Sequence, residues 1–249
     1  MLNVDDLLIS YHAWEAPGLA RLYELSKQSS VVPEGFHPMT FASPPMQQEY
    51  AERRGSLDRP PDEEAALQKE LTYSGIRKER RKSRVRQHEI ASQFYRPPPT
   101  MMRPDERRIA FGTSVLYVQL LQWSRRLGPL TEAVEAYFGR PCTLQGDFYY
   151  PRGGFREWHT NKYDAPGWRL YIVDAQEPRK SYFRIKTPST GEIYTHWDEP
   201  GTFNFFRIDP EHLMWHCIGS DTNRWSKGFV VPDDWRDTVE KDAAAKAAG

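Results

Sequence analysis

Residues 215–226 read Trp-His-Cys-Ile-Gly-Ser-Asp-Thr-Asn-Arg-Trp-Ser, and they hold the most informative spacing in the chain. His216 stands at the expected end of one short strand, and Arg224 opens the next one eight residues later. Ser226 follows Arg224 by two residues, so both side chains point to the same face of a strand. A second histidine, His159, lies upstream within the run Trp-His-Thr-Asn.

Short apolar or alternating segments fill the second half of the chain, and Gly, Pro, Asp and Asn separate them. They recur at a spacing of about ten residues, which is typical of an antiparallel sandwich or barrel. The segments are 143–150, 155–159, 168–173, 181–186, 192–197, 202–208, 213–218 and 225–231. Helical patterns come earlier, so we expect helices that support one side of the β unit.

The paired histidines and the Arg-x-Ser spacing resemble the iron(II)/2-oxoglutarate oxygenases. That superfamily carries His-x-Asp/Glu, then a distal His, then Arg-x-Ser. The resemblance covers residues 142–231, and the His-Thr-Asn run is similar to that of phage-encoded members of unknown function. It implies an α+β fold, with a double-stranded β-helix (jelly-roll, cupin-like) core and N-terminal helices buttressing one side.

The resemblance also implies a metal site and a cosubstrate site. His159 and His216 would bind Fe(II), because imidazole suits iron and leaves open positions for O2 and a cosubstrate. Arg224 would bind the distal carboxylate of 2-oxoglutarate, since a guanidinium offers the planar, two-pronged geometry that lysine lacks. Ser226 would donate a further hydrogen bond to that carboxylate. The two histidines and Arg224 are therefore the predicted catalytic residues.

Aromatic and basic residues on neighbouring segments are predicted to line the same site. The expected wall residues are Tyr150, Trp158, Arg169 and Tyr171. All of these except Trp158 are also expected to help bind the cosubstrate. The alternative for each is ordinary packing inside the barrel.

Asn161 departs from the superfamily pattern, which has a carboxylate two residues after the first histidine. An amide is neutral and is a weaker ligand for a hard divalent ion. Asn161 can bind the metal through its oxygen, or it can leave the position to water or a halide. Asp164 is the second choice as a carboxylate ligand, although Asn and Asp are also common turn residues. A degenerate site is the remaining interpretation.

An iron(II)- and 2-oxoglutarate-dependent dioxygenase is the function that the resemblance implies. Such an enzyme oxidises 2-oxoglutarate to succinate and CO2 while it hydroxylates, or in related halogenases halogenates, an unactivated C–H bond. We expect hydroxylation of an unknown small or macromolecular substrate. The alternative is a non-catalytic β-helix domain that binds a small acid or a protein and has lost its carboxylate ligand.

The chain outside this core is predicted to be an extension, two supporting helices and a tail. Residues 1–108 are expected to form a helical and irregular extension that packs on the core, beginning with an amphipathic helix over 5–28. Residues 109–235 would form the β-helix core, with its supporting helices over 109–138. The Ala- and Lys-rich residues 236–249 are expected to be a flexible tail.

A basic run at 77–86 holds seven Lys or Arg in ten residues. We interpret it as a solvated helix face, and nucleic-acid binding through this run is the alternative that we do not favour. Across the whole chain, 34 basic residues balance 34 acidic ones, so net charge gives no reason to expect a polyanionic partner.

Composition also predicts where the protein works. Its two cysteines, Cys142 and Cys217, are too few for a disulfide framework or a Cys-rich zinc site, and they fit a reducing compartment. The first residues lack a basic segment followed by an apolar run, and no stretch is apolar for the length of a bilayer. We therefore expect a soluble cytoplasmic protein without a membrane partner.

Overall fold

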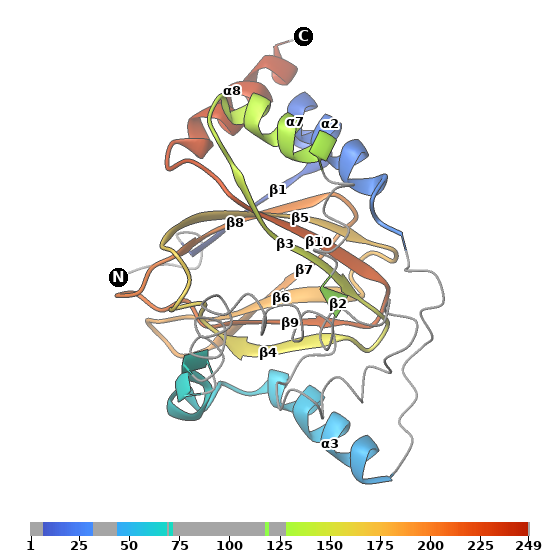
Figure 1. Cartoon of the computed structure of the whole chain (residues 1–249), viewed down its shortest axis with the longest axis vertical. Helices are drawn as coiled ribbons and strands as arrows, with labels where there is room; N and C mark the ends of the chain where they lie inside the picture. The colour runs from blue at the N-terminus through green and yellow to red at the C-terminus, as the bar shows by residue number, and fades with distance from the viewer. Residues whose placement is uncertain (1–6, 32–43, 69, 72–117, 120–127, 249) are drawn as a thin grey trace, which may run out of the picture.

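Two antiparallel sheets face each other at the centre of the molecule (Figure 1). A computed structural model of the chain describes residues 7–31, 44–68, 70–71, 118–119 and 128–248. The larger sheet has the strand order β1 (Leu8–His12), β8 (Thr202–Ile208), β5 (Gly167–Ala175), β10 (Arg224–Val230), β3 (Thr143–Tyr150) and β2 (Val118–Gln119). The smaller sheet has the order β4 (Phe155–His159), β9 (His216–Ser220), β6 (Ser181–Lys186) and β7 (Ile193–Trp197).

The path of the chain through these sheets is that of a double-stranded β-helix. From β3 to β10 the strands pass from one sheet to the other at every step except the hairpin β6–β7. Each segment of alternating apolar residues that the sequence contains overlaps one of these eight strands. The predicted α+β fold with a β-helix core is therefore confirmed.

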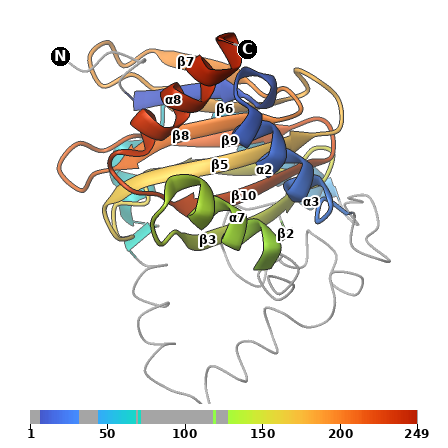
Figure 2. The same cartoon turned by 90° about the horizontal axis from the view of Figure 1, so that it is seen from above.

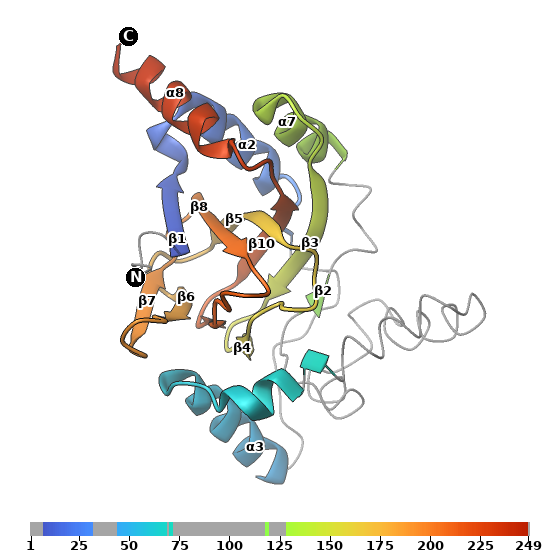
Figure 3. The same cartoon turned by 90° about the vertical axis from the view of Figure 1, so that its left-hand side faces the viewer.

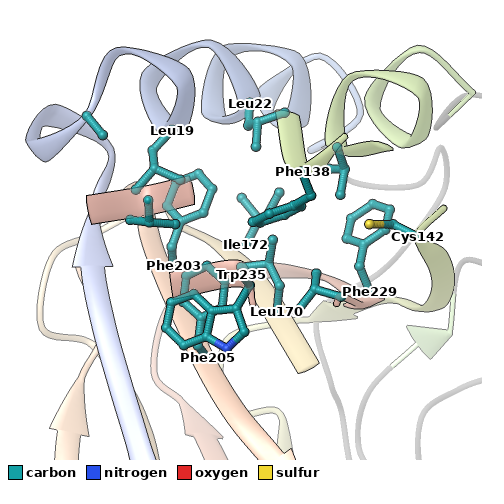
Figure 4. Packing of buried hydrophobic residues seen from close by; sticks show 14 of the residues in the cluster. Leu19, Leu22, Phe138, Cys142, Leu170, Ile172, Phe203, Phe205, Phe229 and Trp235 are labelled. Atoms are coloured by element: carbon teal, nitrogen blue, oxygen red, sulfur yellow. The ribbon is translucent and has the colours of Figure 1, made fainter. Parts of the chain in front are cut away.

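Helices cover the outer face of the larger sheet. They are α2 (Pro17–Lys27), α7 (Gly128–Phe138) and α8 (Trp235–Ala247), and Figure 2 shows them lying across the strands. Strand alternation sends Leu170, Ile172 and Phe205 outward into the cluster beneath these helices (Figure 4). The intervening residues, such as Tyr171 and Phe206, point inward between the sheets. The predicted buttress on one side of the core is thus confirmed.

A separate segment covers the outer face of the smaller sheet. Figure 3 shows α3 (Pro44–Gly55) on the side of the molecule opposite to α8. The 3-10 turn η2 (Ser56–Asp58) follows α3 and places the fully buried Leu57 against Phe155 and Cys217. Each sheet is therefore covered on its outer face by another segment, although Tyr194 and Trp197 on β7 stay exposed.

The N-terminal residues differ from their predicted helix. Leu8–His12 form β1, which pairs antiparallel with β8, and the helix begins only at Pro17. Leu8 faces the interior while Ile9 packs with the outer cluster, which is the two-residue period of a strand. The open edge of β8 supplies backbone partners that the helical spacing of the apolar residues could not reveal.

Two further expectations need correction. Residues 118–119 pair with β3 as a strand within the stretch where a supporting helix was predicted. The rest of 109–127, like the basic run at 77–86, lies outside the described residues. Residues 235–247 form α8 where a flexible tail was predicted over 236–249, because Trp235 and Val239 anchor that helix in the outer cluster. The domain boundaries themselves stay a prediction.

No helix in the described part of the chain combines the length and the apolarity needed to cross a bilayer.

Trp235 should contribute strongly to stability. Its indole is 1% exposed and stacks on Phe205 at 3.7 Å between ring centroids. Replacing a buried aromatic by alanine leaves a cavity, so we expect Trp235→Ala to lower the free energy of unfolding by about 3–5 kcal/mol. The matched control is Trp14→Ala, since Trp14 is 62% exposed, and it should cost less than about 1 kcal/mol. Urea denaturation followed by circular dichroism measures both, and equal losses would contradict the docking of α8.

Candidate functional site

Two buried histidines meet between the sheets. His159 ends β4 and His216 begins β9, the two residues are paired in register, and their ring centroids lie 4.0 Å apart. Nδ1 of His159 donates to the backbone oxygen of Glu157 at 2.7 Å, and Nδ1 of His216 donates to that of Met214 at 3.0 Å. A carbonyl oxygen can only accept, so the proton is on Nδ1 and each Nε2 carries a lone pair that can accept.

Burial keeps both rings neutral. The pKa of His216 is lowered to about 3 and that of His159 falls well below its usual value, in each case mainly through desolvation. The positive charge of Arg156 lowers both pKa values further. Neutral imidazole is the form that binds metal, and Nε2 of His159 is buried without a partner among the described residues. Both rings are therefore neutral with the proton on Nδ1, which is the form of imidazole that can bind a metal through Nε2.

Asn161 turns its oxygen away from this pair. Its Oδ1 accepts a hydrogen bond from Nη2 of Arg156 at 3.1 Å, and its Nδ2 lies 3.3 Å from Nε2 of His216. A guanidinium has only donors, so the amide atom facing Arg156 must be the oxygen. The amide N–H group then donates to the lone pair on Nε2 of His216. This favours the interpretation in which Asn161 leaves the third metal position open over ligation through its oxygen.

Asp164 forms part of a turn. Its backbone N–H donates to the backbone oxygen of Asn161 at 2.8 Å, and Asn161 has a left-handed φ of 58°. Within the described ranges, no group of three His, Cys, Asp or Glu side chains comes together to hold a metal. The turn interpretation of Asp164 therefore fits better than a role as a ligand.

Arg224 lies fully buried at the start of β10, with its fork unpaired. Its Nε donates to Oδ2 of Asp198 at 2.8 Å, and the hydroxyl of Ser181 donates to the same oxygen at 2.7 Å. Its guanidinium carbon lies 5.1 Å from the ring centroid of Tyr150. Nη1 and Nη2 have no partner in the described structure, and neither has the buried hydroxyl of Ser226. A carboxylate ligand would satisfy all three groups.

The predicted wall residues divide into three kinds. Tyr150 packs beside Arg224, and Tyr171 lies edge-on to Phe206, so both line the interior. Arg169 is buried, but its guanidinium donates to the backbone oxygens of Ala165, Gly167 and Trp168. Arg169 therefore holds the loop before β5, and its part in cosubstrate binding stays a prediction. Trp158 was wrongly placed on the wall, because its ring packs on the outer face of the smaller sheet with Leu57.

Four residues of this site were missed by the sequence reasoning: Ser181, Asp198, Arg156 and Glu70. Asp198 and Ser181 act together on Arg224, but each is an ordinary strand-end residue in the sequence. Arg156 stands three residues before His159, where strict alternation would place the two on opposite faces. The pairing of β4 with β9 is irregular between these two residues, so both side chains reach the same interior.

Comparisons with known proteins add likenesses of fold only. No protein-family model matches the chain, and no curated protein matches it. Among solved structures, it is similar to AviO1 from Streptomyces viridochromogenes Tue57, at 14% identity and a TM-score of 0.33 over 47% of this chain and 66% of that one. An oxidoreductase of the 2OG-Fe(II) oxygenase family from Burkholderia pseudomallei shows 9% identity and a TM-score of 0.31, over 44% of this chain and 55% of that one.

A third similar structure is SnoN, a non-heme alpha ketoglutarate dependent epimerase from nogalamycin biosynthesis. It shows 16% identity and a TM-score of 0.32, over 46% of this chain and 60% of that one. The chain thus spans less than two thirds of the length of these structures. They include members of the superfamily that the histidine and Arg-x-Ser motifs resemble, and the strand order described above is what establishes the fold.

His216→Gln should weaken the loss of stability at acid pH in the chelator-treated protein. The folded chain holds the pKa of His216 at about 3, whereas its ordinary value is 6.5. The neutral ring therefore contributes stability fully above pH 6.5, and this is lost as pH falls toward 3 because only the unfolded chain takes up the proton. The loss at pH 5 is about 2 kcal/mol for this histidine. Urea titrations at pH 7 and pH 5 measure it.

The matched control for this experiment is His212→Gln, since His212 is exposed on a loop. It should leave the difference between the two pH values as in the wild type. An unchanged difference in His216→Gln as well would mean that the ring is not held neutral in the folded chain.

Proposed function

We propose that the protein is an iron(II)- and 2-oxoglutarate-dependent oxygenase that hydroxylates a C–H bond. The observation that carries this proposal is the presence, inside one β-helix, of two neutral histidines and of an arginine whose terminal nitrogens have no partner among the described residues. The histidines suit a divalent metal, and the arginine suits a carboxylate. A small dicarboxylic acid bound to a metal has both of these chemical ends.

His159 and His216 would hold the metal through their Nε2 atoms. The backbone oxygens of Glu157 and Met214 fix the tautomer and the direction of each ring before any metal arrives. Bound there, iron(II) would supply the activation of O2 that couples oxidation of 2-oxoglutarate to succinate and CO2 with hydroxylation of the substrate. The hydrophobic rings of Phe183 and Phe206, packed against His216, exclude bulk water from this side.

Arg224 would bind the distal carboxylate of 2-oxoglutarate with Nη1 and Nη2, while Ser226 donates a third hydrogen bond. Asp198 holds the guanidinium by Nε only, so the edge of the fork that faces the ligand stays available. The ring of Tyr150 packs beside the guanidinium and helps to fix its plane. These contacts would hold one end of the acid in a fixed orientation.

The third position beside the histidines would be lined by donors. The amide N–H group of Asn161 and the guanidinium of Arg156 both suit a water molecule or an anion better than a metal–amide bond. Hydroxylation is the proposed outcome, and halogenation is the alternative outcome of the same site. The substrate, a cytoplasmic location and the unfavoured nucleic-acid contact through 77–86 stay predictions.

The direct test is formation of succinate from 2-oxoglutarate with ferrous iron, O2 and ascorbate. Turnover in the absence of substrate is enough, and NMR quantifies the product. If no succinate forms, and calorimetry detects binding of neither Mn2+ nor 2-oxoglutarate, the oxygenase proposal fails.

Arg224→Lys should raise the KM for 2-oxoglutarate by about 10- to 100-fold. Lysine keeps the charge but loses one of two charge-assisted hydrogen bonds, which are worth about 1.5–3 kcal/mol each. Ser226→Ala should have a smaller effect in the same direction. Steady-state succinate production over a range of cosubstrate concentrations gives these values. Arg207→Lys, on the exposed side of β8, is the control, and an equal effect there would remove Arg224 from the binding site.

A second candidate is a non-catalytic β-helix domain that binds a small acid or a protein. The observation that favours it is the amide at Asn161, together with the lack of a three-residue acid or histidine cluster in the described part of the chain. The unpaired fork of Arg224 would then be the binding group for the acid. Iron would have no role in this case.

Asn161→Asp separates the two candidates. In an active oxygenase we expect turnover to fall by about tenfold or more, because the new carboxylate pairs with Arg156 and fills the third position. Succinate production and Mn2+ affinity are measured in parallel for parent and variant. Iron-dependent turnover that appears only in the variant would favour the binding domain instead.

A further inference from the structure

Glu70 binds Thr160, the residue between the two site residues His159 and Asn161. Its carboxylate accepts hydrogen bonds from the backbone N–H of Thr160 and, at 2.9 Å, from the Thr160 hydroxyl. Thr160 is buried, and Glu70 is 90 residues away from it in the sequence. Backbone and side chain of one residue are therefore fixed by a single distant carboxylate.

This contact stabilises an unusual turn. The Thr160 hydroxyl gives its hydrogen to Glu70 and accepts the backbone N–H of Lys162 at 3.1 Å. Asn161 stands in the left-handed region with a φ of 58°, which is unfavourable for a residue with a side chain. Two charged groups hold this turn, since Glu70 accepts from Thr160 and Arg156 donates to the side chain of Asn161.

The same N-terminal segment also holds the other side of His159. Glu157, whose backbone oxygen orients the His159 ring, receives a hydrogen bond on its side chain from Nε of Arg53 at 2.7 Å. Arg53 lies at the end of α3, and both partners of this ion pair are largely buried. His159 is thus flanked by two residues, Glu157 and Thr160, that the segment 50–70 holds in place.

Ion pairs also hold this N-terminal segment on the smaller sheet at positions between Arg53 and Glu70. Arg184 on β6 pairs with Asp58 at 2.5 Å and donates to the backbone oxygen of Leu57 at 2.9 Å. Lys186, two residues further along the same strand, pairs with Glu63. The position of Glu70 is therefore set by strands of the sheet that carries both histidines.

We propose that Glu70 is a positioning residue for the metal centre, acting through Thr160 on His159 and Asn161. This rests on the metal-binding part of the proposed function. Glu70 also places a negative charge on Thr160, the residue between His159 and Asn161, in a chain that has an amide and not a carboxylate at position 161. A carboxylate behind the ligands raises the affinity for a cation without itself being a ligand.

The test is Co2+ binding by the full-length chain, followed by the d–d absorption of the bound ion and by calorimetry. Glu70→Ala should weaken Co2+ binding by about 10- to 100-fold and alter the absorption bands, because the ring of His159 is no longer held in place. Glu70→Gln keeps one acceptor for the Thr160 N–H but loses the charge, so its loss should be smaller, about tenfold. Glu64→Gln, at an exposed position six residues before Glu70, should bind as the wild type does.

A double-mutant cycle separates positioning from mere stability. Thr160→Val removes the hydroxyl and keeps the shape of the side chain, and its effect on Co2+ affinity should not add to that of Glu70→Gln, since both break one contact. Thermal melting of each metal-free variant gives its stability independently, so Glu70→Gln stays informative if Glu70→Ala does not fold. Lower melting temperatures with unchanged affinity and unchanged bands would overturn the proposal.

The failures of the two proposals are distinguishable. If the wild-type chain binds no Co2+, or if His216→Ala binds Co2+ as tightly as the wild type does, the metal site is overturned and the role of Glu70 with it. Binding that depends on His216 but not on Glu70 overturns the role of Glu70 alone.

Discussion

A fully buried guanidinium, held by one carboxylate, is the constraint around which the interior of this β-helix is arranged. Removing Arg224 and Asp198 from water costs several kcal/mol per ion, and that cost is recovered only if the hydrogen bonds of both are made. Asp198 accepts from Nε, and Ser181 donates to the same carboxylate oxygen, but the two terminal nitrogens of Arg224 lack partners in the described structure. Such a core is worse than an apolar one unless a ligand completes it, so the energetic argument for a bound acid is independent of any motif.

The second constraint is the sign of the charge beside the histidines. Arg156 lies where its charge lowers the pKa of both rings, and it turns the Asn161 amide so that N–H groups face the metal position. A carboxylate at position 161 would neutralise Arg156 and occupy that position. With the amide, the guanidinium keeps its charge, which agrees with the proposed binding of a metal together with a dianionic acid. The asparagine and Arg156 are therefore better understood as a pair than as a single loss.

The sequence predicted the eight strands because the relevant signals are local, and the resemblance of the histidine and Arg-x-Ser motifs implied their arrangement as a β-helix. Strand alternation and turn residues mark each strand from β3 to β10, and the His216 to Arg224 spacing reflects one turn between two neighbouring strands. Contacts between distant segments left no such mark. The pairing of β1 with β8 overrode a helical pattern, and two buried anchors turned a presumed tail into α8. Asp198 and Glu70 were missed because single acidic residues acquire meaning only from the partner that folding brings to them.

The smaller sheet shows why the N-terminal segment could not be placed from its own sequence. Along β6, Tyr182, Arg184 and Lys186 alternate with apolar residues, a pattern that normally marks a face turned to water. Here the polar face is covered. Arg54 donates a hydrogen bond to Tyr182, Asp58 pairs with Arg184, and Glu63 pairs with Lys186. Ion pairs of this kind add little stability when exposed, but they are directional and fix where the segment lies. Because specific polar contacts hold this segment, they can place the Glu70 carboxylate at Thr160. An apolar interface of the same area would not ensure that position.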